Sequence, residues 1–339
     1  MTASDTESEP RNPDSMGFET PKIVIVGGGA MGSLFGGLLA QGGLDVTLLD
    51  IWKEHVDAIN RDGLRIVGHG GDRTVRVAAT LDPKTLAAAD VVLFQCKAFA
   101  NDTAARSVQH VVKGSTVVIS FQNGLGNEET LGRILGEEHV LGGLTAQGAT
   151  VVEAGVIRNF CDLPTYIGEF GGGLSERATA IANAFTRHGL PTTASADIKK
   201  EKWQKLLGNV ALGAVSAATQ LTSAEIVAIP ELREVVLRAL DETAAVARAC
   251  GVALGDSEKR AIFDRQTSVR AGGTGASKSS MAADIAHRRR TEIDTINGSV
   301  SRLGREKGVA TPTIDTMIGI VKGLEANYAH TAVNRERAG

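Results

Sequence analysis

Segment 200–209 is the part of this chain best suited to acid–base chemistry; it reads Lys-Glu-Lys-Trp-Gln-Lys-Leu-Leu-Gly-Asn. Lys205 and Asn209 are four residues apart in it, so on a helix they share one face. A lysine on a face that enters a cleft can donate a proton to a carbonyl oxygen while a hydride arrives at the carbon. We expect Trp203 to point elsewhere and to belong to the core.

A second group of polar side chains lies in a long stretch of helical spacing, 279–307. Ser280 and Glu292 are twelve residues apart there, so on one straight helix their side chains would point about 120° apart. Either a cleft near the start of this helix serves both residues, or the helix bends. The helical periodicity alone predicts that Glu292 is a solvent-exposed charged residue.

Two more polar residues follow apolar runs that have the composition of buried strands, 91–96 and 115–120. Lys97 comes directly after the first run, where it could contact a cofactor or an acidic substrate, or belong to a solvated loop. Asn123 comes after the second run, and its amide could bind a carboxamide or carboxylate, or serve the turn itself. The spacing leaves these alternatives open.

These residues need a scaffold, and the first apolar run of the chain predicts one. Strand 22–26 leads into a Gly-x-Gly-x-x-Gly motif, then a helix of small residues, 33–41, and a second strand that ends in Asp50. The motif alone is a weak signal in a chain with 40 glycines. The order of strand, glycines, helix and acid, with the acid about twenty residues on, predicts a dinucleotide-binding βαβ unit.

The glycine turn has specific physical requirements, and the cofactor contacts that we predict in it are Gly27, Gly29, Ala30, Met31 and Gly32. Gly27 permits the tight turn out of the strand. Gly29 lets the backbone approach the pyrophosphate, which would bind at the positive N-terminal end of the helix. Gly32 lets the helix pack close to the strands.

Asp50 predicts which dinucleotide is used. At the end of the second strand its carboxylate can accept hydrogen bonds from both hydroxyls of the adenosine ribose. A 2′-phosphate would be repelled there, so NAD(H) is favoured and NADP(H) is the alternative. In the other interpretation Asp50 caps a turn and nearby Lys53 neutralises a phosphate.

The remaining pattern predicts the fold class: an α/β Rossmann-type N-terminal domain with a mainly parallel sheet, plus an all-α C-terminal domain. We expect a disordered leader over 1–20, the dinucleotide-binding domain over 21–195, a helical substrate and dimerisation domain over 196–330, and a tail over 331–339. The expected helices of the second domain are 197–218, 223–229, 230–250, 257–265, 279–307 and 311–327. Ligands bind outside the carboxyl ends of the strands in open sheets, so we expect the chemistry between the domains.

Composition excludes several functional classes. The 339 residues carry a net charge of −3, and the pI near 6.2 argues against general nucleic-acid binding. Three widely spaced cysteines, Cys96, Cys161 and Cys250, argue against a disulfide framework or a zinc site, and we expect no metal. No apolar run approaches the ~20 residues that span a bilayer. These features are typical of a cytoplasmic enzyme that acts on a small molecule.

Taken together, the motifs resemble those of the ketopantoate reductase (2-dehydropantoate 2-reductase) family over nearly the whole chain after the leader. The motifs that carry the resemblance are Gly27-x-Gly29-Ala-Met-Gly32, Lys97, Phe121-Gln-Asn123-Gly, Trp203-x-Lys205-Leu-x-x-Asn209, Ser279-Ser280-Met and Thr291-Glu292-Ile-Asp294-x-x-Asn297-Gly298. The last two are far more specific than the glycine motif.

The resemblance implies hydride transfer from a reduced nicotinamide to the keto carbon of a 2-oxo acid, which gives the (R)-2-hydroxy acid. It implies that Lys205 is the general acid, and that Glu292 supports the geometry of the substrate and the lysine. The substrate-binding residues that it implies are Asn209, Ser280, Asn123 and Lys97. The last two are implied to contact the cofactor as well. An ammonium beside the forming alkoxide would stabilise its charge.

Two positions depart from the family pattern. Members often use NADPH and have a phosphate-binding residue after the second strand, where this chain has Asp50. Gly213 stands where a second asparagine is common, which removes a polar contact and opens space for the substrate. These departures favour an NAD-dependent member that acts on a different, branched or aryl, 2-oxo acid.

Two other functions share part of the pattern. A 3-hydroxyacid dehydrogenase of the 6-phosphogluconate type has a similar layout and a Lys-x-x-x-Asn motif, but the block from Ser280 to Glu292 favours the first family. A non-catalytic dinucleotide-sensing module is the other alternative. Such a module would need no proton donor, so the presence of Lys205 argues against it. Apolar residues in 210–215 and 235–249 could support a homodimer or be buried in the domain's own core.

Overall fold

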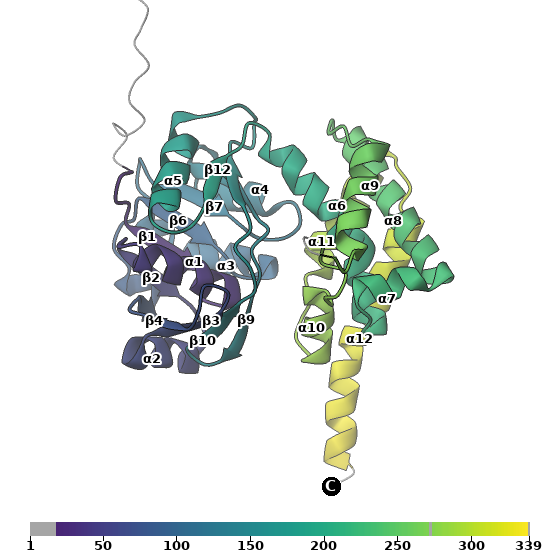
Figure 1. Ribbon diagram of the computed structural model, residues 1–339, viewed down its shortest axis with the longest axis horizontal. Helices are drawn as coiled ribbons and strands as arrows, with labels where there is room; N and C mark the ends of the chain where they lie inside the picture. Colours follow the sequence, from purple (N-terminus) through teal and green to yellow (C-terminus); the bar gives the residue numbers. More distant parts are fainter. Residues whose placement is uncertain (1–17, 271–272, 338–339) are drawn as a thin grey trace, which may run out of the picture. The chain divides into compact units, whose positions relative to one another are not determined.

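The computed structural model describes residues 18–270 and 273–337, and for 329–337 it describes the backbone alone. The chain divides into two compact units (Figure 1). The first unit holds the chain up to Cys96 together with Asp102–Phe121 and Leu131–Ile198. The second holds Lys97–Asn101, Gln122–Thr130 and the chain from Lys199. Most of the predicted leader lies outside the described residues, and Phe18, which is described, is already buried in the core.

The first unit is built on an eight-stranded sheet of order β12-β11-β8-β7-β6-β1-β2-β5. Its strands are β1 (Ile23–Val26), β2 (Val46–Leu49), β5 (Ala78–Thr80), β6 (Val91–Phe94), β7 (Val117–Ser120), β8 (Val140–Thr145), β11 (Thr165–Gly168) and β12 (Thr192–Ala194). Every neighbouring pair is parallel except β8 and β11. The sequence prediction of a mainly parallel sheet is confirmed.

Helices cover both faces of this sheet because alternate residues of each buried strand point to opposite sides. Ile23 and Ile25 pack with α1 (Ala30–Gln41) and α5 (Glu176–Arg187), whereas Val24 and Val26 pack on the other face. The helices that cover that other face include α3 (Asn101–Ser107) and α4 (Asn127–Leu135).

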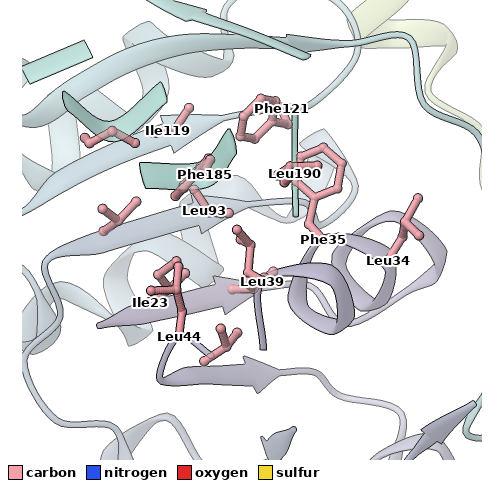
Figure 2. Close-up of a cluster of buried hydrophobic side chains, with 14 of the residues drawn as sticks. Ile23, Leu34, Phe35, Leu39, Leu44, Leu93, Ile119, Phe121, Phe185 and Leu190 are labelled. Atoms are coloured by element: carbon pink, nitrogen blue, oxygen red, sulfur yellow. The ribbon is translucent and has the colours of Figure 1, made fainter. Parts of the chain in front are cut away.

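Figure 2 shows the core on the α1 side, where Phe35 of α1 meets Phe121 just after β7. The two rings lie edge to face, with centroids 5.1 Å apart. Such aromatic pairs stabilise a core beyond the area that they bury. They hold the end of β7, and therefore the start of the loop that follows it, against the helix after the glycine turn.

A smaller four-stranded sheet of order β4-β3-β10-β9 also belongs to the first unit. It contains β3 (Leu64–Gly68), β4 (Arg73–Val75), β9 (Ala149–Glu153) and β10 (Val156–Asn159), and α2 (Lys53–Asp62) precedes β3. Segment 149–157 has the composition of a strand, and in the structure it forms β9 and the start of β10, which pair as a hairpin in this smaller sheet. The turn of this hairpin needs Gly155, whose φ is +77°.

The second unit is helical, as predicted. Its helices are α6 (Ile198–Thr219), α7 (Ser223–Ala228), α8 (Pro230–Ala249), α9 (Asp256–Thr267), α10 (Ser280–Ala286), α11 (Ile293–Lys307) and α12 (Pro312–Arg337). Trp203, Leu207 and Val210 of α6 are buried in its core, so the expectation that Trp203 is a core residue is confirmed. Among the helices that the structure describes, none is long and apolar enough to cross a bilayer.

Two expected helices of the second unit need correction. The stretch 279–307 is not one helix, because the chain leaves helical geometry after Ala286 and resumes it at Ile293. Arg288 in this break has φ +53°, a conformation that ends a helix. The last helix runs to Arg337, beyond the expected end at residue 327 and through most of the segment expected as a tail.

Candidate active site

The glycine turn of the first unit has the close contacts that its sequence predicts. A Cβ on Gly27, whose φ is +102°, would lie 2.4 Å from the backbone nitrogen of Cys96. A Cβ on Gly32 would lie 1.8 Å from the carbonyl oxygen of Gly27. At Gly29, the N-cap of α1, a Cβ would meet open space. The turn is therefore packed on its inner side and open at the helix N-terminus, where a pyrophosphate can be held by backbone N–H groups.

Asp50 lies beside this turn. A Cβ on Gly28 would approach the Asp50 Cβ to 3.3 Å, and the Asp50 Oδ1 accepts a hydrogen bond from the Trp52 backbone N–H at 2.8 Å. The carboxylate thus takes part in the turn that begins α2, as the alternative interpretation held. Its second oxygen remains available on the side of the glycine turn, so both interpretations are compatible with the structure.

Lys97, which follows β6 after Gln95 and Cys96, belongs to the second unit and lies in an ion cluster there. Its Nζ donates to the Asp284 Oδ2 at 2.8 Å and to the Glu292 Oε2 at 3.1 Å. Both carboxylates are nearly buried, with side chains 6% and 7% exposed. Arg289 also contacts Asp284, at 3.0 Å. We call these four residues the Lys97 cluster.

The electrostatics of this cluster favour a permanently charged lysine. Burial opposes the charge on Lys97, but the attraction of Glu292 and then of Asp284, with the hydrogen bonds to both, outweighs it and raises the pKa of Lys97. A lysine with a raised pKa holds its proton, so Lys97 is suited to binding anionic or polar groups and unsuited to proton transfer near neutral pH.

A chain of amide side chains positions the loop after β7. Gln122 donates to Asn101 at 2.5 Å, Asn101 donates to Asn127 at 2.9 Å, and Asn127 donates to the carbonyl of Asn123 at 3.0 Å. A Cβ on Gly124 would lie 2.2 Å from the Thr295 carbonyl oxygen, so this loop packs tightly on α11. Asn123 is therefore held by its backbone, which leaves its side chain for other contacts.

Lys205 of α6 has a different environment from Lys97. Part of its surface is reached by solvent, yet its pKa is lowered to about 8. Desolvation among the surrounding protein atoms is the largest cause, the charge of Lys202 acts in the same direction, and the charge of Glu292 opposes both. A pKa near the working pH is what general acid catalysis requires.

Lys202 is itself buried and forms an ion pair with Glu128 of α4. This pair joins the first turns of α6 to the start of α4, which follows the loop that carries Asn123. Paired charges persist in a protein interior only when their geometry compensates for lost hydration. Lys202 therefore stays fixed one turn before Lys205.

A cavity of about 150 Å³ lies in the helical unit beside these residues. It is lined by Gly208, Asn209, Leu212, Gly213, Ser223, Gln266, Thr274, Ser277, Lys278, Ser279, Ser280, Met281 and Ile296. We call it the Asn209 pocket. Asn209 is one helical turn beyond Lys205, and a Cβ on Gly213 would meet only the Met281 Cε, at 3.9 Å. Gly213 therefore leaves space in this pocket.

The structure brings the predicted residues of the helical half together. Asn209 and Ser280 line one pocket, and Lys97, Glu292 and Lys205 are linked through direct contact or charge. Within residues 18–270 and 273–328, whose side chains the structure describes, the side chains of Asn123, Asn209 and Ser280 form no hydrogen bond. They are therefore available to bind a ligand.

Asp284 lies in the polar stretch that begins at Ser279, but the sequence assigned it no role in the site. Its carboxylate binds Lys97 as directly as that of Glu292 does. One signal was present in the sequence, because Asp284 follows Ser280 by four residues and so shares its helical face. Its partner is 187 residues away, which no local pattern indicates.

Comparisons with known families match both halves of the chain. Residues 23–172 match the family described as ketopantoate reductase PanE/ApbA, and residues 197–325 match its C-terminal counterpart. Similar proteins include the 2-dehydropantoate 2-reductase of Halobacterium salinarum, with 35% identity over 89% of this chain and 98% of the relative. The enzyme of the same name from Archaeoglobus fulgidus is 32% identical over 90% of this chain and 98% of its own length.

Solved structures are similar over comparable lengths. A ternary structure of D-mandelate dehydrogenase with NADH and anilino(oxo)acetate has a TM-score of 0.85 and 28% identity, and covers 90% of this chain and 99% of the other. A ketopantoate reductase of the same family from Ralstonia eutropha has a TM-score of 0.82 and 31% identity, over 90% and 99% of the two chains.

Proposed function

The chain belongs to the ketopantoate reductase family, and on this premise we propose that it reduces a 2-oxo acid to a 2-hydroxy acid with NADH as hydride donor and Lys205 as general acid. One observation carries this proposal: a lysine whose pKa is lowered to about 8 stands one helical turn from the Asn209 pocket. The fold and the family membership make the chain a nicotinamide-dependent oxidoreductase; the substrate, the cofactor preference and the residue roles are what we propose.

Bound NADH would supply a hydride to the keto carbon of the substrate. Lys205 contributes the proton: its ammonium donates to the carbonyl oxygen as negative charge develops on that oxygen. The pKa of about 8 keeps Lys205 mostly protonated at neutral pH while making the proton easier to release than from an ordinary lysine. The products are a hydroxyl group and a neutral lysine amine, which solvent reprotonates.

Asn209 and Ser280 would hold the polar groups of the substrate. Both line the same pocket, and neither side chain has a hydrogen-bond partner in the described part of the chain. A ligand that binds them therefore breaks no internal hydrogen bond. Glu292 has a supporting role, because its charge acts on Lys205 while its carboxylate binds Lys97.

Asp50 and the glycine turn support NADH as the hydride donor. A carboxylate beside the turn matches the hydroxyls of an unphosphorylated ribose and repels a 2′-phosphate. The D-mandelate dehydrogenase that resembles this chain was solved with NADH, which is in line with this preference.

Gly213 supports a substrate with a branched or aryl side chain. The space beside it would accept larger substrate groups than would a site narrowed by an asparagine at this position. Ketopantoate, the substrate named for the relatives, is the second candidate because those relatives match nearly the whole chain.

Initial rates of NADH and NADPH oxidation by the purified chain test the proposal, with ketopantoate measured beside a panel of branched and aryl 2-oxo acids. We expect faster turnover with NADH, and a larger kcat/KM for a branched or aryl acid than for ketopantoate. Chiral chromatography of the product tests whether it is the (R)-2-hydroxy acid. Oxidation of neither cofactor with any 2-oxo acid would contradict the proposed function.

A further inference from the structure

Two fully buried polar side chains lie behind the glycine turn, Ser33 of α1 and His55 of α2. The Ser33 hydroxyl donates to the Gly28 carbonyl at 2.6 Å, and its oxygen lies 3.0 Å from the His55 Nε2. The His55 Nδ1 accepts a hydrogen bond from the Gly155 backbone N–H at 2.9 Å. A continuous hydrogen-bonded chain therefore runs from the β9–β10 turn to the glycine turn.

The direction of every bond in this chain is determined. The Gly155 N–H can only donate, so the His55 Nδ1 must be the unprotonated nitrogen. The neutral ring then carries its proton on Nε2 and donates it to the Ser33 oxygen. The Ser33 hydroxyl hydrogen is left for the Gly28 carbonyl, so each hydrogen in the chain has one acceptor and no bond can reverse alone.

The chain determines which way one peptide unit faces. The Gly28–Gly29 peptide is trans, since no cis peptide bond occurs among the described residues, and the C=O and N–H of a trans peptide point in opposite directions. Because the Gly28 carbonyl is bound by Ser33 on the inner side, the Gly29 N–H points outward. A Cβ on Gly29 would meet only open space, so the outer side is accessible.

We propose that His55, acting through Ser33, is a positioning residue that holds the Gly29 N–H toward the pyrophosphate of the bound dinucleotide. Without this restraint the glycines on either side would let the peptide rotate, and a carbonyl oxygen would then face the phosphate. The inference rests on the proposed function, because it assigns His55 and Ser33 to the binding of the same cofactor.

The surroundings of His55 keep its ring neutral and immobile. The Trp52 ring stacks on it, with centroids 4.9 Å apart and planes inclined by 7°. Burial lowers the pKa of His55, while the charge of Asp50 and the Gly28 carbonyl oppose that effect only in part. A Cβ on Gly155 would lie 2.8 Å from the Ala58 Cβ, so the donor to His55 is also closely packed.

The test compares Ser33→Ala and His55→Phe with the unmodified chain. We expect both variants to raise the Kd for NADH, measured by fluorescence titration, about three- to tenfold, the effect of losing one hydrogen bond. The KM for NADH should rise in parallel, while kcat at saturating NADH and the KM for the 2-oxo acid stay within about twofold. His55→Gln, which can still donate to Ser33, should restore most of the affinity.

Thr116→Val is the matched control. Thr116 is buried in the same unit and donates to the Ala89 carbonyl at 2.6 Å, away from the glycine turn. Its loss removes a buried hydroxyl and should leave the Kd for NADH unchanged. Thermal melts identify any variant that fails to fold, and Ser33→Ala, which removes a single oxygen atom, decides the question where His55→Phe does not fold.

The outcomes separate two failures. A folded Ser33→Ala variant that binds NADH as tightly as the unmodified chain would overturn the inference alone. A loss of affinity that His55→Gln fails to restore, or that Thr116→Val shares, would overturn it as well, since general destabilisation would then be the cause. If the unmodified chain binds neither NADH nor NADPH, the proposed function fails and the inference with it.

Discussion

Lys97 and Lys205 lie in the same unit, and their surroundings act on them in opposite ways. In the Lys97 cluster, two nearly buried carboxylates share one ammonium and raise its pKa. Beside the Asn209 pocket, burial and the charge of Lys202 lower the pKa of Lys205 to about 8. The sequence identifies both lysines as candidate site residues, but the surroundings of Lys205 alone suit it to giving up a proton.

Glu292 links the two lysines. It contacts Lys97 directly and attracts the charge of Lys205. The carboxylate therefore limits how far the pKa of Lys205 falls, which keeps it charged at neutral pH. The contrast is one of balance: at Lys97 the attraction of two carboxylates outweighs the cost of burial, whereas at Lys205 burial and the charge of Lys202 outweigh the attraction of Glu292.

Removing Lys205 gives the largest expected effect. Lys205→Met should lower kcat by about 10²–10⁴-fold, because the developing alkoxide loses its proton donor. The Kd for NADH should change little, since the glycine turn belongs to the other unit. Steady-state rates at saturating NADH and 2-oxo acid measure this. Lys199→Met, on the same helix, is the matched control. Retention of more than a tenth of kcat by Lys205→Met would remove the lysine from the mechanism.

Removing Lys97 is expected to act on stability. Lys97→Met leaves the nearly buried Asp284 and Glu292 without their shared cation, and should lower the free energy of unfolding by about 1–2 kcal/mol. The loss is limited because Lys97 is 39% exposed, and because Arg289 still contacts Asp284.

Urea denaturation measures this loss. The comparison variant is Lys53→Met, which breaks an exposed lysine–aspartate pair and should leave the free energy of unfolding nearly unchanged. Equal losses in the two variants would show that the Lys97 cluster stabilises no more than a surface pair does.

The pH dependence of the rate separates the two lysines further. Only the ammonium form of Lys205 donates a proton, so the rate of 2-oxo acid reduction should be level below pH about 8 and fall about tenfold per pH unit above it. The rate of the reverse oxidation, which needs the neutral amine, should rise through the same pH. Stopped-flow rates of the hydride-transfer step in both directions measure these profiles.

The like charge of Lys202 provides a way to shift the pH midpoint of these two rate profiles, which is set by the pKa of Lys205. Replacing the buried pair together, as Lys202→Met with Glu128→Leu, removes the repulsion without leaving an unpaired charge. The pKa of Lys205 should then rise, and the midpoint of both profiles should shift to higher pH. A midpoint that stays in place in the folded double variant would mean that Lys202 does not act on Lys205.

Filling the pocket gives the smallest expected effect. Gly213→Asn should reduce kcat/KM for a bulky aryl 2-oxo acid relative to ketopantoate by up to about tenfold, because the side chain occupies the space beside Met281. The ratio of the two kcat/KM values measures the change. Gly319→Asn, at an exposed helical position with open space around it, is the control. Unchanged relative rates across the panel would show that the pocket argument is wrong.

Sequence reasoning succeeded where the determining contacts are local. The βαβ unit around Gly27 follows from a strand, a turn and a helix that are adjacent in the chain. The shared face of Lys205 and Asn209 follows from helical spacing within one helix. Both features depend on order and spacing along the chain, from four residues in the helix to about twenty between the glycine motif and Asp50, so one stretch of sequence contains the necessary information.

Sequence reasoning failed where contacts between distant segments determine the local backbone conformation. The stretch 279–307 has helical spacing throughout, but the Thr291 backbone N–H is bound at 2.6 Å by Glu325, which lies on the last helix. Arg289 is likewise drawn to Asp284. These contacts stabilise a break that periodicity does not show. The parallel pairing of β3 with β10 is likewise outside the reach of local patterns, since Arg65 pairs there with Val156, far along the chain.

The sequence by itself determined the family, the dinucleotide-binding βαβ unit, and the residue types available for proton donation and substrate binding. The tertiary structure alone decided that Asp284 completes the Lys97 cluster, that Ser33 and His55 support the glycine turn, and that Lys205 has a lowered pKa. The physical reason is that motifs depend on spacing along the chain. Burial, charge pairing and hydrogen-bond direction depend instead on which distant segments meet in space.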